Sequence, residues 1–370
     1  MRRLLILHDS PDFGGHERML LALLPGVLER GDFDDIVFMV PEQNQRLADR
    51  LAAELPAIRV VRWPFVKRRG EPYLGQFRWR YRRAVRAIVA REQPNTVLLV
   101  QGRIENLVVP MLALDARINV VSYVPMAHRL TQMGRAGFPG DLVRRRLYRR
   151  PDRFIVPARS VVEQVRLAGG TAPVTVATNS VEMPPMVPQG EARAALGLAG
   201  GKRIALFLGR LEMAQKGLDV LLGALERSAA GAFSGWTFVF VGDGPDRAWL
   251  ETALAKTRVD ARLVAWTDDP QAYLAAADVL LMPSRFEGLP LVMLEAMQGG
   301  LPILASDIDV TREYLPAGSR IDFASADLAA ALDKVTDPAG VAAYRDASRA
   351  MLAPQTLAAA QAEFAAALAA

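Results

Sequence analysis

The chain has 370 residues, with 45 Lys and Arg against 40 Asp and Glu, three His and no Cys. A single hydrophobic core stops growing near about 250–300 residues, so this length predicts two domains. The lack of Cys excludes a disulfide scaffold, a thiolate zinc site and a Cys nucleophile, and the wide spacing of the three His argues against a multi-His metal site.

The first predicted element is a buried strand over the apolar run Leu4–Leu7. This run is shorter than the apolar region of a signal peptide, about 7–15 residues, and no stretch approaches the roughly 18 apolar residues of a membrane span. We therefore expect a cytoplasmic protein.

Gly14-Gly15 follow the strand and precede a helical pattern, where paired glycines let backbone N–H groups approach an anion. A structural turn is the alternative, because no dinucleotide or P-loop spacing is present.

Short apolar runs alternate with helical segments through the first half, which is typical of a parallel sheet flanked by helices. The predicted strands there are Leu4–Leu7, Ile36–Val40, Val60–Arg62, Thr96–Val100, Val120–Val124 and Arg153–Val156.

Charge is unevenly divided between the two halves of the chain. Residues 1–180 hold 29 Lys and Arg but 17 Asp and Glu, whereas residues 181–370 hold 16 Lys and Arg and 23 Asp and Glu. This asymmetry indicates a polyanionic partner for the first half.

One basic segment combines positive charge with an apolar stripe. Its basic residues are Lys67, Arg68, Arg69, Arg78, Arg82 and Arg86, and its stripe is Phe77, Tyr81, Val85 and Ile88. A basic amphipathic helix with aromatic residues suits an anionic membrane surface, gaining about 1 kcal/mol per basic residue near it. The alternative is a helix that docks on the protein by its apolar stripe and leaves its basic face in solvent. A second basic cluster consists of Arg144-Arg145-Arg146 with Arg149-Arg150. It too can be interpreted as a membrane-binding surface or as a solvated face. No nucleic-acid motif accompanies the charge, so we expect no nucleic-acid partner.

A Pro-rich stretch ends the first half at Pro184, Pro185 and Pro188, as in an extended linker. The alternation then restarts with predicted strands Arg203–Leu208, Thr237–Val241, Ala261–Val264, Val279–Met282 and Pro302–Ala305. The expected organisation is an N-terminal Rossmann-like domain over residues 1–180 and a C-terminal one over residues 181–352. An Ala-rich helix over residues 353–370 is expected to cross back to the first domain. Two such α/β halves imply a cleft between them.

Arg210 and Lys216 follow the first strand of the second half. Ligands of open α/β sheets bind beyond the C-terminal ends of the strands. A guanidinium and an ammonium group at that edge are suited to neutralise a diphosphate. Ordinary surface exposure is the alternative for this pair.

Two glutamates flank a predicted helix start further along the chain. Glu287 precedes Pro290, which suits the first turn of a helix, whereas Glu295 lies within the apolar run Leu291–Met297. Carboxylates accept hydrogen bonds from vicinal hydroxyls, and N–H groups near Gly288 suit phosphate, a combination that fits a sugar nucleotide. The alternative is an ordinary amphipathic helix with a solvated Glu295.

Taken together, these motifs resemble the retaining GT-B glycosyltransferases of family 4. The residues that carry the resemblance are Gly14-Gly15-x-Glu17, Gly209-Arg210-Leu211, Lys216-Gly217, Val241–Pro245, Glu287-x7-Glu295 and Glu313. The resemblance implies an α/β GT-B fold, in which two Rossmann-like doubly wound domains face a central cleft. It also implies transfer of a hexose from a UDP- or GDP-linked sugar to a hydroxyl of a lipid-linked or cell-surface glycan. Such reactions build bacterial polysaccharides, including lipopolysaccharide and exopolysaccharide.

The same resemblance assigns roles to individual residues. It places Arg210 and Lys216 at the donor diphosphate, Gly15, Gly288 and Leu289 at phosphate, Glu295 at the ribose and Glu287 at the donor sugar. It places His128 facing the transferred sugar, with a buried structural histidine as the alternative. It implies no cofactor and no metal, so Asp307-Ile308-Asp309 is interpreted as structural. Trp266 stands where the family often has Gly, which leaves the nucleotide base open.

The expected partners are a nucleotide sugar, a glycan or lipid-linked acceptor and an anionic membrane surface. The expected location is the cytoplasm, with peripheral attachment to the inner face of the cytoplasmic membrane. Three alternatives remain: a GT-B sugar-nucleotide epimerase, a dinucleotide oxidoreductase that lacks the usual fingerprint, and a non-catalytic scaffold that binds membrane or polyanion.

Overall fold

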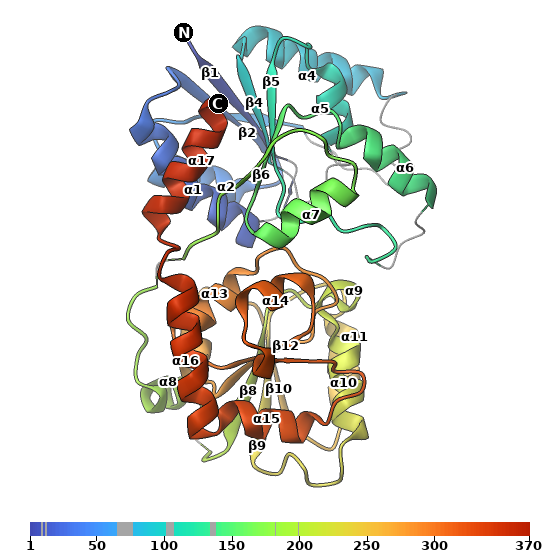
Figure 1. The fold of residues 1–370 in the computed structure, drawn as a ribbon, viewed down its shortest axis with the longest axis vertical. Coiled ribbons are helices and arrows are strands. Elements are labelled where there is room, and N and C mark those ends of the chain that lie inside the picture. The colour runs from blue at the N-terminus through green and yellow to red at the C-terminus, as the bar shows by residue number, and fades with distance from the viewer. Residues whose placement is uncertain are drawn as a thin grey trace. The chain divides into compact units, whose positions relative to one another are not determined.

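The computed structural model describes residues 1–8, 10–11, 13–64, 77–100, 107–133, 138–181, 183–198 and 200–370. It divides into two compact units, one joining Met1–Ser180 to Gln355–Ala370 and the other spanning Val181–Pro354. Each unit contains its own parallel sheet with helices packed against it (Figure 1). The predicted fold class, α/β with two Rossmann-like units, is confirmed.

The sheet of the first unit has the strand order β3-β2-β1-β4-β5-β6-β7, and each pairing is parallel. Its strands are β1 (Arg3–His8), β2 (Asp35–Pro41), β3 (Arg59–Trp63), β4 (Thr96–Val100), β5 (Asn119–Tyr123), β6 (Arg153–Val156) and β7 (Val174–Val176). Its helices are α1 (Gly15–Arg30), α2 (Gln45–Glu54), α4 (Trp79–Glu92), α5 (Val108–Ala113), α6 (Phe138–Leu147), α7 (Arg159–Leu167) and α17 (Leu357–Ala369). The strand order reverses between β1 and β4, so ligand-binding loops are expected at their C-terminal ends.

Burial explains why most of these strands were predictable. The central strands β1 and β4 are covered on both faces, and their side chains are almost wholly buried. Such strands read as continuous apolar runs rather than as alternating patterns. The strand β7 was missed, because its three half-buried residues at the sheet edge are too few to form a pattern.

The sheet of the second unit has the order β10-β9-β8-β11-β12-β13, again with parallel pairings. Its strands are β8 (Arg203–Leu208), β9 (Trp236–Val241), β10 (Asp260–Val264), β11 (Val279–Met282), β12 (Ile303–Ser306) and β13 (Arg320–Ile321). Its helices are α8 (Gln189–Ala195), α9 (Met213–Lys216), α10 (Leu218–Arg227), α11 (Arg247–Leu254), α12 (Pro270–Ala276), α13 (Leu291–Gln298), α14 (Asp309–Tyr314), the 3-10 helix η3 (Ala317–Ser319), α15 (Leu328–Thr336) and α16 (Pro338–Leu352). The order reverses between β8 and β11, which makes the loops after these two strands the expected binding position.

Helix α17 belongs to the first unit although it follows the whole of the second unit in the chain. It lies beside α1 (Figure 1). The approach is close at Gly26, where an added Cβ atom would lie 2.5 Å from Cβ of Gln361. The amide of Gln361 also donates to the carbonyl oxygen of Ala22 at 2.7 Å, and the ring of Phe364 meets that of Tyr123 edge-on. The first core is therefore completed by a segment distant in sequence.

Candidate functional site

The candidate donor site lies in the second unit, where loops follow the neighbouring strands β9, β8 and β11. The strands run parallel, so their C-terminal ends lie at one edge of the sheet. Gly209 follows β8 and Gly242 follows β9, and a Cβ atom at Gly242 would lie 2.0 Å from the carbonyl oxygen of Gly209. These two loops therefore pack backbone to backbone, an approach that only glycine permits.

Glu287 is the centre of a hydrogen-bond network in the loop after β11. Its side chain is buried, and its Oε1 atom lies 2.6 Å from Nζ of Lys216 and 2.7 Å from Oγ of Ser284, which donates to it. Its other oxygen accepts a hydrogen bond from the Gln215 side-chain amide at 3.0 Å. A buried carboxylate needs such partners, because an uncompensated charge is costly to bury. The structure thus brings together Lys216 and Glu287, two of the predicted site residues.

The Lys216 loop approaches the Glu287 loop closely because the residue between α9 and α10 is Gly217. Its φ angle is +62°, in the left-handed region, and an added Cβ atom would lie 2.0 Å from the carbonyl oxygen of Pro283. Any side chain here would push the two loops apart. Gly217 consequently sets the distance at which Lys216 meets Glu287.

A second ion pair fastens the same two loops together. The guanidinium of Arg285 donates to both carboxylate oxygens of Asp219, at 2.8 and 2.7 Å, and to the carbonyl oxygen of Met213 at 2.8 Å. The hydrogen bond to Arg285 holds the pKa of Asp219 below its usual value, against a smaller opposing effect of desolvation. The same bond raises the pKa of Arg285. Sequence analysis missed Arg285, Gln215 and Ser284, because their roles depend on the approach of two loops distant in the chain.

Arg210 lies at the same sheet edge as the Glu287 network, in the loop after β8. Its side chain is 59% exposed, and its Nε atom lies 3.5 Å from Oε2 of Glu212. It follows strand β8, next to β11 in the sheet, so it is available to a ligand at this edge. The structure thus holds Lys216 in an ion pair and leaves Arg210 largely in solvent.

The two predicted glutamates occupy the positions expected from sequence. Glu287 precedes α13, whose N-cap is Pro290, and Glu295 lies within the helix. Glu295 is buried at 3% exposure, so the alternative of a solvated side chain is wrong. Leu289 is also buried, and the helix ends at Gln298 with Gly299 as its C-cap. Each of these residues belongs to the second unit, together with Arg210 and Lys216.

Two other motifs of the second unit have clear structural partners. The backbone N–H of Trp266 donates to Asp243 at 3.0 Å, and its side chain is 51% exposed after β10. Asp307 pairs with Arg312 at 3.1 Å and with Arg320 at 2.7 Å. The hydrogen bond from Arg312 is the main cause that lowers the pKa of Asp307. The carboxylate of Asp307 is therefore engaged with two arginines.

The glycine loop of the first unit is held by a buried pair that sequence analysis did not single out. Oε1 of Glu17 lies 2.8 Å from Nε2 of His8, and Oε2 accepts the backbone N–H of Gly14 at 2.8 Å. Gly14 is the N-cap of α1, and Gly15 is its first residue. Glu17 thereby fixes the turn that exposes both glycines at the end of β1. The one signal in the sequence was the Glu three residues after the N-cap.

Ionisation of this pair is set by its surroundings. Burial would raise the pKa of Glu17, but the His8 hydrogen bond and the nearby histidine charges outweigh it and lower the pKa to about 2. Burial lowers the pKa of His16 to about 4, against the opposing charge of Glu17. The ring of His16 packs edge-on against Tyr123. At neutral pH the loop is therefore fixed by an ionised Glu17 beside a neutral His16.

His128 lies in the loop after β5, in the first unit. It is buried, and its carbonyl oxygen accepts a hydrogen bond from Arg144 at 2.7 Å. The neighbouring N–H of Ala127 donates to the Gln164 side chain at 2.9 Å. These bonds fix the backbone that carries the imidazole ring.

The predicted basic helix is present as α4, with one correction. The helix begins at Trp79, so Phe77 is not part of its apolar face and is 70% exposed. Val85, a residue of the predicted stripe, is buried, and so is Val89, which the prediction did not include. Arg78 stacks over Tyr81 at 4.4 Å, and Arg86 is exposed. Lys67, Arg68 and Arg69 lie outside the described residues, and Arg82, on α4, is half-buried.

Among the residues that the structure describes, no helix is long and apolar enough to cross a membrane. In the same part of the chain, no cluster of three or more His, Asp or Glu side chains is arranged to hold a metal ion.

Comparison with known proteins gives one family match by sequence. Residues 202–337 match the family described as Glycosyl transferases group 1. A 2-deoxystreptamine glucosyltransferase of Streptomyces kanamyceticus is 34% identical over 162 residues, which cover 40% of this chain and 40% of the relative. The chain thus spans less than half the length of this curated relative.

Similarity in structure extends over nearly the whole chain. HepE of Anabaena, solved in complex with UDP and glucose, has a TM-score of 0.76 at 19% identity and covers 99% of this chain and 99% of that one. WaaG, a glycosyltransferase involved in lipopolysaccharide biosynthesis, has a TM-score of 0.72 at 15% identity and covers 100% of this chain and 99% of that one. At these identities the likeness establishes a shared fold.

Proposed function

Because this chain is a family 4-like protein of the GT-B glycosyltransferases, we propose that it transfers a hexose from a UDP- or GDP-linked sugar to a hydroxyl group of a glycan. The acceptor is a lipid-linked or cell-surface glycan, and the transfer retains the configuration of the anomeric carbon. The bound UDP and glucose of Anabaena HepE support a nucleotide-sugar donor.

The observation that carries the proposal is the ion pair between Lys216 and the buried Glu287. An ammonium group beside a carboxylate suits a nucleotide sugar, because one side chain can bind phosphate while the other accepts hydrogen bonds from sugar hydroxyls. Helix α13 begins at Leu291, four residues after Glu287, and its N-terminus adds a partial positive charge. Arg210, exposed at the same sheet edge, supplies the second full positive charge for the diphosphate.

In the proposed reaction, the bond between the anomeric carbon and the diphosphate oxygen breaks while the acceptor oxygen bonds to the same face of that carbon. The proton of the acceptor hydroxyl passes to the departing phosphate oxygen. Negative charge therefore grows on the diphosphate, and Lys216, Arg210 and the N–H groups near Gly288 stabilise it. Losing one such donor commonly costs about 3–4 kcal/mol in the activation barrier. These cationic groups take the place of a divalent metal, so we expect the reaction to proceed in EDTA.

The roles proposed for the other site residues are those that the family resemblance implies. Glu295 accepts hydrogen bonds from the ribose hydroxyls, Gly15 binds phosphate through its backbone N–H, and His128 binds the transferred sugar. Leu289 contributes its backbone N–H to phosphate binding. Burial of Glu295 and the fixed backbone around His128 support these roles, because a preorganised group loses little entropy when it binds.

The first unit is the proposed acceptor half, and we place the protein in the cytoplasm against the inner face of the membrane. Helix α4 supports this, since it carries the exposed Trp79 and the basic residue Arg86, and the basic residue Arg78 is its N-cap. An aromatic side chain among arginines suits the anionic surface of a membrane. The role of WaaG in lipopolysaccharide biosynthesis is consistent with such an acceptor.

A binding experiment can identify the nucleotide-sugar donor without any acceptor. A thermal-shift screen over UDP-, GDP-, ADP- and CMP-sugars should raise the melting temperature for one nucleotide, because a ligand of the native state stabilises it. The hit should then be hydrolysed slowly, and Lys216→Met should abolish both effects. No shift with any sugar nucleotide would contradict the proposal. Conversion of the donor to an epimer without an acceptor would favour the epimerase instead.

A further inference from the structure

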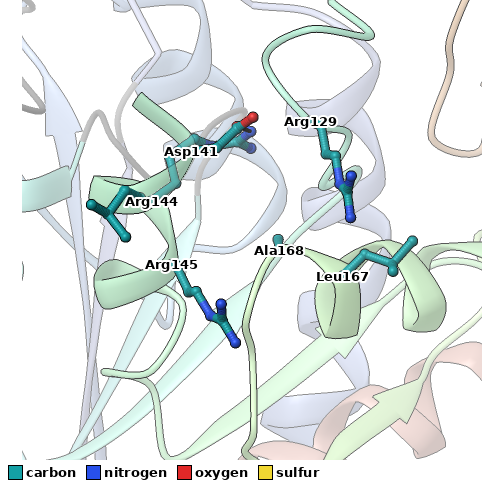
Figure 2. Close-up of a pocket in the computed structure, with 7 residues that line it drawn as sticks. Arg129, Asp141, Arg144, Arg145, Leu167 and Ala168 are labelled. Atoms are coloured by element: carbon teal, nitrogen blue, oxygen red, sulfur yellow. Dashed lines mark ion pairs between the residues drawn. The ribbon is translucent and has the colours of Figure 1, made fainter. Parts of the chain in front are cut away.

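The first unit contains a basic pocket between the loop after β5, helix α6 and the end of α7 (Figure 2). Its volume is about 250 Å³. It is lined by Arg129, Asp141, Leu142, Arg144, Arg145, Leu167 and Ala168. Three arginines against one aspartate give this pocket an excess of positive charge.

The charges of the pocket divide into a neutralised pair and two available cations. Arg144 is buried, lies 3.6 Å from Asp141 and donates to the carbonyl oxygen of His128 at 2.7 Å. Asp141 also accepts the backbone N–H of Leu130 at 3.1 Å. Arg129 and Arg145 are exposed, and neither has an ion-pair partner within the described part of the chain. Their two guanidinium groups are therefore available to an anion.

Local geometry holds one of these cations in place. The stem of Arg145 lies against Gly169 in the turn after α7, where an added Cβ atom would lie 2.4 Å from its Cγ atom. Gly169 has a φ angle of +102°, which a residue with a side chain rarely adopts. Figure 2 shows the guanidinium groups of Arg129 and Arg145 on either side of Ala168. The pocket thus offers two separated cations, one of them packed against the backbone.

Apolar side chains line the same pocket. Leu142 on α6 is 55% exposed and Leu167 on α7 is 57% exposed. Each belongs to the lining that contains the arginines, so a ligand there meets positive charge and apolar surface together. A bare phosphate ion would use only the arginines.

We propose that this pocket binds the diphosphate of a lipid-linked acceptor at the point where it joins the apolar chain. Arg129 and Arg145 pair with the phosphate oxygens, and Leu142 and Leu167 contact the first carbons of the chain. The inference rests on the proposed transferase function and specifies its acceptor. It also gives Arg144 a positioning role, since this side chain neutralises Asp141 and holds the backbone of His128.

The test uses geranyl diphosphate, a soluble diphosphate with a short apolar chain, in calorimetric titrations of the full chain. The variant Arg129→Gln/Arg145→Gln should weaken its binding by about tenfold or more, since charge-assisted hydrogen bonds to phosphate are lost. Arg146→Gln is the matched control, because Arg146 is exposed on the same helix but does not line the pocket. Unchanged binding in the double variant, or an equal loss in the control, would overturn the proposal.

Two further comparisons identify the ligand. Inorganic pyrophosphate should bind more weakly than geranyl diphosphate, and equal binding would refute the apolar contacts. The double variant and the wild type should co-sediment equally with vesicles of phosphatidylglycerol and phosphatidylcholine. If the double variant lost binding to vesicles but not to geranyl diphosphate, the two arginines would contact the membrane instead.

The variant Lys216→Met distinguishes binding of the probe in this pocket from binding in the proposed donor site. This variant should bind geranyl diphosphate normally, and loss of the probe in this variant alone would mean that it enters the donor site. The probe carries neither nucleotide nor sugar, so failure of the donor proposal would appear in the sugar-nucleotide screen and not here.

Discussion

Lys216 and Glu287 form a 2.6 Å ion pair in which the carboxylate is almost completely buried and the lysine side chain is 17% exposed. The two residues are distant in sequence and meet because β8 and β11 are neighbours in the sheet. A buried pair of this kind adds little to stability on its own, since desolvation offsets the attraction. Its position at the edge where the strand order reverses instead favours a role in ligand binding.

Replacing Lys216 should remove activity far more than it lowers stability. In Lys216→Met the apolar stem remains, and Glu287 keeps its hydrogen bonds from Gln215 and Ser284. We expect kcat/KM to fall by about 100-fold or more, and the free energy of unfolding to fall by roughly 1–3 kcal/mol. Steady-state kinetics and urea unfolding measure the two effects. Lys202→Met is the control, because Lys202 pairs with Asp260 away from this edge, and its activity should be unchanged.

Breaking the Arg285–Asp219 pair should loosen the donor loops with a small cost in stability. Both side chains are more than a third exposed, so we expect only about 0.5–1 kcal/mol from Arg285→Gln. The larger effect should be a raised KM for the donor, because the loop that carries Lys216 loses its fastening. A double-mutant cycle with Asp219→Asn checks this: additive effects on KM would mean that the pair does not position the loop.

Gly217→Ala should destabilise the second unit through both strain and a backbone clash. The left-handed φ angle alone costs about 1–2 kcal/mol for Ala, and contact with the Pro283 carbonyl oxygen adds to it. Gly231→Ala separates the two causes, since Gly231 has a φ angle of +83° but nothing within 4 Å of an added Cβ. Thermal unfolding should therefore show a greater loss for Gly217→Ala. Equal losses would refute the clash.

Acid should destabilise the first unit through His16 and Glu17. The folded chain keeps His16 neutral down to about pH 4, whereas the unfolded chain protonates it below pH 6.5. Glu17 likewise stays ionised to about pH 2 when folded and protonates below pH 4.5 when unfolded. In both windows the unfolded state binds more protons, so the free energy of unfolding falls as pH falls.

The size and origin of this acid effect can be measured with one variant. His16 contributes at most about 1.4 kcal/mol per pH unit between pH 6.5 and pH 4. His16→Phe keeps a ring against Tyr123 but removes the titrating group, so its unfolding free energy should depend less on pH in this window. The same slope in both proteins would show that other groups cause the acid effect.

Sequence reasoning predicted the parallel sheets because their central strands are buried on both faces and therefore read as continuous apolar runs. It failed at β7 and β13, whose three and two residues are too few to carry a pattern. It also extended the apolar stripe of α4 to Phe77, which precedes the helix.

For the site, the sequence supplied residue types at the ends of strands but not their partners. Lys216 was predicted at the C-terminal edge of a strand and Glu287 in a loop before a helix, and the family resemblance assigned both to the donor. Arg285 joins the two loops through its ion pair with Asp219, and Gly217 allows the same loops to approach closely. Both features depend on tertiary contacts, which no local sequence pattern encodes. The same holds for His8, whose bond to Glu17 fixes the glycine loop.

The packing of α17 against α1 has a consequence for how the protein is made. Translation must deliver the whole of Val181–Pro354 before the segment that completes the first core emerges from the ribosome. Until then the surface of α1 around Gly26 is without its cover, while the second unit is already a continuous stretch of chain. The order of synthesis thus favours maturation of the later unit before the earlier one.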